Sequence, residues 1–501
     1  MRSRTTQFAL NAAGNYLRFA VSLASVFFLT PRIIEAVGKD DYGLWTLVNS
    51  ALGILGLLDL GFGNGIVKYT AECKGSGDLE KRDYIVSTLF IVYSVLSVIG
   101  TILVAVLAYY FTSLFDIPVS QHQKAIILLW IVSGRSVIAY LPLSLFRGVL
   151  FGEQKIFQIN LIQILTNLVN IAVVIAALKM GYGIIFYAII NFAIMLSEHL
   201  LYIVYCKLSV EKFKVSVALF RKDIFREVFS FSSYSFLISV SALVLLRTDP
   251  LIVKCFMPLS EVTIYSISMK IAENALLLIK QYVNILGPLV AELKGSGDEA
   301  KIRFIFTNCA KFAFAPAALM ASAAVIFSAD ALSFWVGKDF AAGAVPLIIL
   351  MWAMALSVPQ MVSSSILGMT GEHRFTAMAA MKSIGINIVA SVILAGPLKM
   401  SGVALGTMAA VVSVDLLIVC RYACRLYKVP FSSYAVRVLF PGMASSLIFI
   451  ASAQALKSFH PPSSLLEVFL EMLVPSILFA LFFYYFFVEE SEKALFRKRS
   501  S

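Results

Sequence analysis

Residues 85–111 read IVSTLFIVYSVLSVIGTILVAVLAYYF, a run that contains no charged side chain. A helix of about 20 apolar residues crosses the roughly 30 Å hydrocarbon core of a bilayer, so this run predicts a membrane-spanning helix. Hydrophobic residues make up 60% of the whole chain and charged residues only 14%, a composition that excludes an ordinary soluble protein. We therefore expect lipid to surround most of the chain.

Similar apolar runs follow one another along nearly the whole sequence, separated by short polar loops. We count fourteen, at 7–29, 43–66, 85–111, 123–146, 156–178, 183–206, 228–253, 262–290, 304–328, 343–368, 375–396, 402–424, 434–456 and 465–488. Backbone polar groups in lipid must be satisfied within the spanning element, and the runs lack the alternation of a membrane barrel, so we predict helices. The first run is long and carries Asn11, Asn15 and Arg18, which indicates a membrane helix rather than a signal peptide. The expected fold class is all-α integral membrane, with about 14 transmembrane helices.

The basic residues indicate how the chain is oriented. With the N-terminus inside, most of the 41 Lys and Arg residues fall on one side, which the positive-inside rule assigns to the cytoplasm. Both termini are then cytoplasmic. The most basic loop joins the sixth and seventh runs and contains Lys207, Lys212, Lys214, Arg221, Lys222 and Arg226. Such loops contact anionic membrane lipids, so the net charge of +12 requires no nucleic-acid partner.

An internal repeat divides the chain. The stretch 71–78, AECKGSGD, returns as AELKGSGD at 291–298, which is 220 residues later. Because this offset spans an even number of crossings, we infer two homologous lobes related by a parallel pseudo-two-fold axis, with a cavity between them. The expected domains are a six-helix lobe at 1–210, the basic loop at 211–227, a second six-helix lobe at 228–428, a helix pair at 429–488 and a cytoplasmic tail at 489–501.

Charged side chains inside the predicted helices would cost about 2.5–3.5 kcal/mol each at the bilayer centre, so most must face water or one another. They are Arg18, Arg135, Arg247, Lys270, Lys280, Lys311, Lys382, Asp59, Glu198, Asp249, Glu273 and Asp415. Lys280, Lys311, Lys382 and Glu198 lie toward predicted cytoplasmic helix ends, where long side chains reach the interface. The excess of cations favours an anionic substrate group such as phosphate or pyrophosphate.

From these residues we choose the candidate site. The substrate-binding candidates are Arg18, Arg135, Arg247, Lys270, Asn15 and Asn274. The candidates for ion coupling or ion pairing are Asp59, Asp249, Glu273 and Asp415. Two plainer interpretations stay open, because Asn side chains also stabilise helix packing and because neighbouring Arg247–Asp249 and Lys270–Glu273 can pair locally.

Motifs of enzymatic chemistry do not occur in the sequence. It has no Walker A motif, zinc-ligand cluster or nucleophile elbow, and its six cysteines have neither disulfide nor metal spacing. The stretch Gly61-Phe62-Gly63-Asn64-Gly65 lies inside a membrane run, so we interpret it as a close-packing or hinge segment. We expect a membrane transporter, not an enzyme, with no metal and no cofactor.

Several motifs resemble one transporter family. They are Thr30-Pro31, Gly38-Lys39-Asp40-Asp41-Tyr42-Gly43-Leu44-Trp45, Leu58-Asp59-Leu60-Gly61-Phe62-Gly63, Arg247-x-Asp249 and Tyr265-Ser266. This pattern is similar to the polysaccharide transporter family, the O-antigen and capsule repeat-unit flippases of the multidrug, oligosaccharidyl-lipid and polysaccharide exporter superfamily. The resemblance covers essentially the whole chain.

The resemblance implies a function in surface polysaccharide biosynthesis, for O-antigen, capsule or exopolysaccharide. It implies a bacterial inner-membrane flippase that moves an undecaprenyl-pyrophosphate-linked oligosaccharide from the cytoplasmic to the periplasmic leaflet by alternating access. Its expected partners are the lipid-linked oligosaccharide, membrane lipids, and polysaccharide polymerase and chain-length proteins. A proton or sodium gradient and the periplasmic removal of product stay open as energy sources.

Three other functions stay open at this point. A peptidoglycan-precursor flippase shares the fold and the helix count. A cation-coupled multidrug exporter of the same superfamily would need an acidic, aromatic pocket, against which the excess of cations argues. A membrane glycosyltransferase or polymerase usually needs a large periplasmic loop, and every predicted loop here is short.

Overall fold

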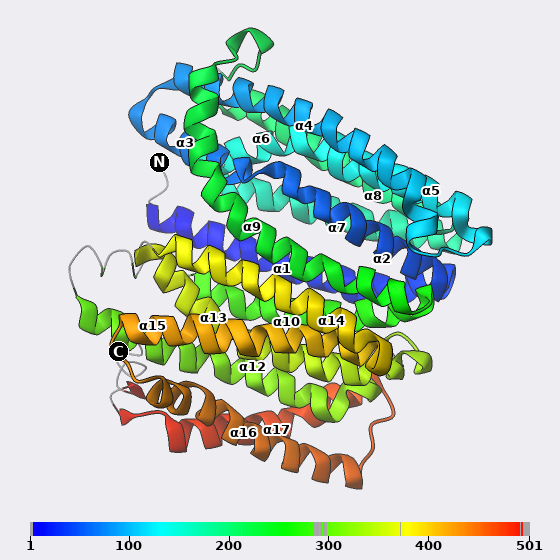
Figure 1. The fold of residues 1–501 in the computed structure, drawn as a ribbon, viewed down its shortest axis with the longest axis vertical. Helices are drawn as coiled ribbons and strands as arrows, with labels where there is room; N and C mark the ends of the chain where they lie inside the picture. The colour runs from blue at the N-terminus through cyan, green and yellow to red at the C-terminus, as the bar shows by residue number, and fades with distance from the viewer. Residues whose placement is uncertain are drawn as a thin grey trace. The chain divides into compact units, whose positions relative to one another are not determined.

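The computed structural model describes residues 4–493 except 212, 285, 287–289, 291–292, 294–297, 371 and 491. Every element in this described part is helical (Figure 1). Eleven of the described helices are long and apolar enough to cross a membrane, or twelve spans result when a bent helix pair is counted as one. The chain is thus an all-helical, multi-pass membrane protein, as expected, with fewer separate candidate spans than the fourteen apolar runs.

The first compact unit comprises Met1–Thr263. Its helices are α1 (Arg4–Val37), α2 (Lys39–Ile54), η1 (Leu55–Asp59), α3 (Phe62–Ser76), α4 (Leu79–Leu114), η2 (Val119–Gln121), α5 (His122–Ser133), η3 (Gly134–Ala139), α6 (Tyr140–Gly152), α7 (Ile156–Lys179), α8 (Ile184–Ser209), η4 (Val217–Leu219) and α9 (Lys222–Phe256). Helix α1 packs against α7, and α3 packs against α6. Helix α9, which the sequence assigns to the second lobe, packs against α2, α3 and α4 and falls within this unit.

The second compact unit comprises Ile264–Ser501. It contains most of α10 (Leu259–Asn284), then α12 (Glu299–Trp335), η5 (Lys338–Gly343), α13 (Ala344–Thr370), α14 (His373–Ala410), η6 (Val411–Cys420), α15 (Arg421–Leu426), α16 (Phe431–Phe459) and α17 (Leu465–Phe487). Helix α12 packs against α13 and α16, and α16 packs against α17. Buried apolar residues such as Phe327, Phe449 and Phe479 form the core between α12, α16 and α17.

One candidate span, Arg374–Leu426, is a hairpin of two antiparallel arms. Lys399 interrupts α14 with a non-helical φ of 51° and ψ of −134°. Across this break Asn387 Nδ2 donates to Thr407 Oγ1 at 2.9 Å, whereas 20 residues in a continuous helix would be about 30 Å apart. Ser391 Oγ likewise donates to the Val403 carbonyl at 3.2 Å. The two arms correspond to the separate runs expected at 375–396 and 402–424.

The run expected as one helix at 43–66 is broken in the structure. Leu60 and Gly61 both adopt left-handed backbone angles, with φ of 49° and 77°, and the flanking helical segments are bent by 41°. Such a conformation costs a non-glycine residue about 1–2 kcal/mol, so Leu60 holds local strain. Beyond the break, a Cβ on Gly65 would lie 2.9 Å from Val228 Cγ1, so α3 and α9 approach closely at this glycine. The Gly61–Gly65 segment therefore contains both a helix break and a close contact.

The internal repeat extends to local backbone geometry. Asp78 caps α4 and accepts a hydrogen bond from the Lys81 backbone N–H at 2.9 Å. Asp298 caps α12 and accepts the same bond from Lys301 at 3.0 Å. The two caps also share backbone angles, with φ/ψ of −83°/77° and −84°/70°. Most of the second copy, 291–292 and 294–297, lies outside the described residues.

Candidate functional site

A cluster of charged and polar side chains lies inside the first unit, on α1, α6, α7 and α8. Its centre is the Glu198 carboxylate on α8, which accepts hydrogen bonds from Tyr202 Oη at 2.7 Å and Gln163 Nε2 at 3.3 Å. Arg18 on α1 interacts electrostatically with both Arg147 on α6 and Glu198. We call Arg18, Arg147, Gln163, Glu198 and Tyr202 the arginine cluster.

The arginine cluster has an excess of positive charge and unused hydrogen-bond donors. It holds two guanidinium groups against one carboxylate. The Nε atoms of Arg18 and Arg147 are buried and have no hydrogen-bond partner among the residues that the structure describes. Buried donors without acceptors are costly, and guanidinium groups match the oxygens of phosphate. The cluster is therefore chemically suited to a phosphorylated anion.

A line of tyrosines extends from the arginine cluster toward the helix break. Tyr140 on α6 hydrogen-bonds Arg147 and interacts electrostatically with Asp59. The fully buried Tyr93 on α4 donates a hydrogen bond of 2.5 Å from its Oη to Asp59 Oδ1. The backbone N–H of Gly63 points to the other carboxylate oxygen of Asp59, at 3.5 Å. Asp59 is thus an acid at a helix break, in the same unit as the cationic cluster.

Arg135 and Arg247 form a second cationic pair in the first unit. Arg135 lies in the π-helical segment η3, and Arg247 lies on α9 within electrostatic range of it. The Arg247 side chain packs over Gly53 of α2, because a Cβ added there would lie 3.0 Å from both Cδ and Nε. Asp249, two residues further along α9, is fully buried. The structure thus brings two predicted substrate-binding arginines together.

Asn15 is engaged in a contact between helices. Its side-chain oxygen accepts a hydrogen bond from Asn160 Nδ2 at 3.0 Å, which joins α1 to α7. Asn160 is 3% exposed. This geometry matches the interpretation that such amides stabilise helix packing.

The remaining predicted residues belong to the second unit. Asn274 Nδ2 donates to the carbonyl of Lys270 one turn earlier on α10, at 2.7 Å, and Glu273 lies between them in sequence. Asp415 lies in a different element, the π-helical segment η6. Within this unit, Asp415 therefore lies on a different element from the three residues of α10.

The sequence suggested that Lys311, near a predicted helix end, reaches the membrane interface. In the structure its side chain is instead buried within the second unit. Its Nζ lies 2.6 Å from both carboxylate oxygens of Glu492, and it also donates to the Phe487 carbonyl at 3.1 Å. The side chains of Lys311 and Glu492 are 7% and 3% exposed. This ion pair attaches the segment after α17 to α12.

Sequence reasoning missed Arg147 because the predicted fourth run ended at residue 146. In the structure α6 continues to Gly152, so Arg147 lies inside a helix. Glu198 was placed toward a helix end, but α8 continues for 11 residues beyond it, or about 16 Å. The signal available was the spacing of Tyr140 and Arg147, which are seven residues apart and share a helix face.

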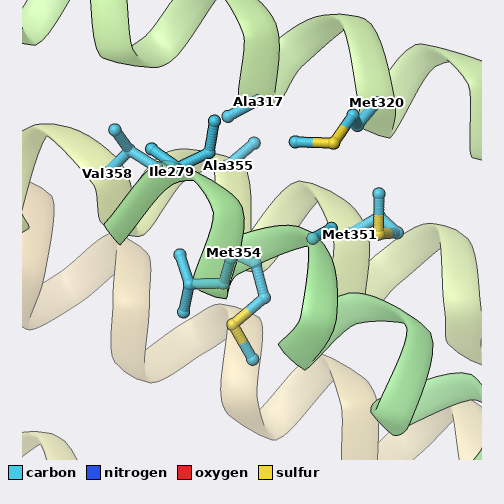
Figure 2. Close-up of a pocket in the computed structure, with 9 residues that line it drawn as sticks. Ile279, Ala317, Met320, Met351, Met354, Ala355 and Val358 are labelled. Atoms are coloured by element: carbon cyan, nitrogen blue, oxygen red, sulfur yellow. The ribbon is translucent and has the colours of Figure 1, made fainter. Parts of the chain in front are cut away.

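The second unit also contains a small pocket, with a cavity volume of about 10 Å³, between α10, α12 and α13 (Figure 2). Its lining is apolar and includes Ile279, Met320, Met351, Met354 and Val358. Ligand sites usually combine a larger volume with a few convergent polar groups. This pocket is therefore a gap in the core and not a site for a charged substrate.

Comparison with known sequences gives a family and two relatives. A family model described as "Polysaccharide biosynthesis protein" matches residues 21–294. A "Putative O-antigen transporter" of Salmonella typhi is 24% identical over 299 residues, which cover 58% of this chain and 65% of that protein. A protein of the same description from Salmonella typhimurium is 25% identical over 300 residues, which cover 55% and 62%. Each match thus spans less than two thirds of the relative's length.

Comparison with solved structures establishes the fold. "Lipid II flippase MurJ, inward closed conformation" superposes with a TM-score of 0.73 over 95% of this chain and 98% of that chain, at 16% identity. An inward-facing multidrug resistance MATE family transporter of the MOP superfamily gives a TM-score of 0.66 over 81% and 98%, also at 16% identity. At these identities the likeness concerns the fold alone.

Proposed function

The chain belongs to the Polysaccharide biosynthesis protein family, as its motifs led us to expect, and we propose that it is a flippase for a lipid-linked oligosaccharide. The cargo is an undecaprenyl-pyrophosphate-linked repeat unit, moved from the cytoplasmic to the periplasmic leaflet for surface polysaccharide synthesis. The description of both Salmonella relatives supports this cargo. The observation that carries the proposal is the arginine cluster, in which the buried Nε atoms of Arg18 and Arg147, without a partner among the described residues, suit a pyrophosphate.

We include in the proposal the finer architecture expected from the sequence. The protein spans the bacterial inner membrane with fourteen helices and both termini in the cytoplasm, and it works by alternating access. The two arms of Arg374–Leu426 and the apolar run at 228–253 support a count above twelve. The matching caps at Asp78 and Asp298 support two homologous lobes, 1–210 and 228–428, with a linker at 211–227, a helix pair at 429–488 and a tail at 489–501, of which 491 and 494–501 lie outside the described residues.

The substrate-binding residues in this proposal are Arg18, Arg135, Arg247, Lys270 and Asn274, to which we add Arg147. Asn15 serves as a packing residue, because Asn160 engages it. For coupling to protons or sodium ions, the carboxylates of Asp59, Asp249, Glu273 and Asp415 are the candidates. Asp59 has the best support, since its contact with Tyr93 lies at the strained helix break.

The test is genetic complementation with matched arginine variants. Deletion in the host should abolish surface polysaccharide and leave lipid-linked repeat units on the cytoplasmic face. Wild type should restore export, whereas Arg18→Ala, Arg147→Ala and Arg247→Ala should not, at equal membrane expression. Arg32→Ala is the control, because Arg32 lies on the same helix as Arg18 but is exposed and donates to the Phe28 carbonyl of its own helix. Loss of export in all four variants would reject a specific site.

A second candidate function is a flippase for a peptidoglycan precursor, which the fold similarity at a TM-score of 0.73 favours. It predicts that the chain sustains growth of cells depleted of their own lipid II flippase. A multidrug exporter predicts instead a deletion strain with normal surface glycan and new sensitivity to cationic dyes. These outcomes separate the three functions in one strain background.

A further inference from the structure

An apolar groove with a volume of about 350 Å³ runs along α4 in the first unit, distinct from the arginine cluster. Its lining includes Leu60, Phe62, Val95, Phe220, Phe225 and Phe229, and we call it the phenylalanine groove. Leu60 is the strained residue at the helix break. The groove thus lies beside the segment that interrupts α2 and α3.

Three of its phenylalanines form one continuous aromatic wall. The ring centroids of Phe225 and Phe229 are 5.7 Å apart, and each lies about 6 Å from Phe62, at 6.3 and 6.1 Å. Phe62 is fully buried, whereas Phe229 and Phe220 are each 44% exposed. The wall therefore has a fixed base and an open edge along which an apolar chain can enter.

Positive charge gathers at the end of the groove where α9 begins. Arg221, Lys222 and Arg226 are exposed and alternate in sequence with the groove residues Phe220, Phe225 and Phe229. Two acids, Asp223 and Glu227, share this segment, but Lys81 pairs with Glu227 at 3.1 Å. Lys222 and Arg226 form no ion pair within the described part of the chain. Lys222 and Arg226 thus lie next to an aromatic wall, whereas Arg221 already contacts Tyr84.

The cationic end is held at a defined distance from the groove. The backbone N–H of Arg221 donates to Thr88 Oγ1 at 3.1 Å, and its guanidinium lies 4.5 Å from the ring centroid of Tyr84. Tyr84 and Ile91, the first groove residue of α4, are seven residues apart on this helix, or about 10 Å. An anionic headgroup at Arg221 would therefore place its attached chain at the mouth of the groove.

We propose that the phenylalanine groove holds the phosphate-proximal isoprenoid units of a polyprenyl phosphate lipid when it is first captured, while Arg221, Lys222 and Arg226 bind its phosphate before the headgroup moves on to the arginine cluster. The inference rests on the proposed function and names the lipid half of that substrate. The apolar groove would bury the isoprenoid chain of the lipid, and the adjacent cations would bind its phosphate. Both lie on the side that the positive-inside rule assigns to the cytoplasm, where such a substrate begins.

The experiment uses the purified full-length protein in nanodiscs with a photoreactive polyprenyl phosphate, and peptide mapping locates the cross-links. We expect cross-links in 60–62, 91–96 and 220–229 that unlabelled polyprenyl phosphate displaces and phosphatidylglycerol does not. The triple variant Arg221→Gln, Lys222→Gln, Arg226→Gln should lower labelling about tenfold. Lys207→Gln with Lys214→Gln removes exposed charge from the end of α8 and the segment after it, and is the control.

Other outcomes decide against the groove. Equal displacement by phosphatidylglycerol means a general anionic-lipid surface, and equal loss in the control variant means that only net charge matters. Phe225→Ala with Phe229→Ala should also reduce labelling, whereas Phe486→Ala, an exposed ring on α17, should not. If groove variants export glycan normally while Arg18→Ala fails, the groove is wrong and the flippase function stands. If the deletion strain keeps its glycan, the function itself fails.

Discussion

Breaking the buried ion pair between Lys311 and Glu492 should destabilise the second unit strongly. Lys311→Met leaves the Glu492 carboxylate in a site where it is 3% exposed, without the ammonium that contacts both its oxygens at 2.6 Å. Removing one partner of such a pair typically costs about 3–5 kcal/mol. The third contact of Lys311, to the Phe487 carbonyl, is lost as well. We therefore expect a loss of about 4 kcal/mol in the free energy of unfolding.

The assay is a double-mutant cycle on purified protein, unfolded by denaturing detergent in mixed micelles. Lys311→Met with Glu492→Leu removes both charges and should recover most of the loss, because an apolar pair carries no desolvation penalty. Glu490→Gln is the control, since its side chain is 79% exposed and its pair with Lys493 should contribute under about 1 kcal/mol. If Lys311→Met costs no more than this control, or if the single losses simply add in the double variant, the buried pair does not hold the segment after α17.

Three further predictions concern the helix ends and the loops. A hydrogen bond with Glu471 raises the pKa of His460 in the loop between α16 and α17, so the pair stabilises the folded protein below the unfolded value of about 6.5 and this contribution is lost as pH rises through the folded value. The difference in unfolding midpoint between about pH 5.5 and 8.5 should therefore shrink in His460→Gln, and an unchanged difference would exclude this pair as its source. Asp78→Ala and Asp298→Ala should each cost about 1 kcal/mol by the same unfolding assay, and a large inequality would argue against equivalent caps. Cys255 is exposed and follows the run at 228–253, which is predicted to cross from the cytoplasm to the outside. An impermeant maleimide should therefore label it in intact cells, and labelling only after lysis would indicate the opposite topology.

The sequence predicted the membrane class and most helix positions, because an apolar run of spanning length permits few other structures in lipid. The break at Leu60 was not predictable from hydropathy, since leucine is apolar in either conformation. Only the neighbouring glycines indicated it. The turn at Lys399 was predicted by the interval between the two runs.

The candidate site was predicted in part. The sequence found Arg18, Arg135 and Arg247 from the cost of charge in lipid, but it does not show which charges meet. Arg147 was not predicted as a site residue because the predicted fourth run ended one residue before it. The pairing of Lys311 with Glu492 joins residues 181 positions apart, so no local pattern could indicate it.

Two embedded charges, Arg135 and Asp415, lie in the π-helical segments η3 and η6. A π-helical turn contains about one residue more than an α-helical turn, so each segment amounts to a one-residue insertion accommodated within a helix. Deleting one residue there would restore regular α-helix and rotate everything beyond it by about 100° relative to everything before it. In related chains, single-residue length differences at these two places should therefore coincide with a change in which side chains share a face with the charge.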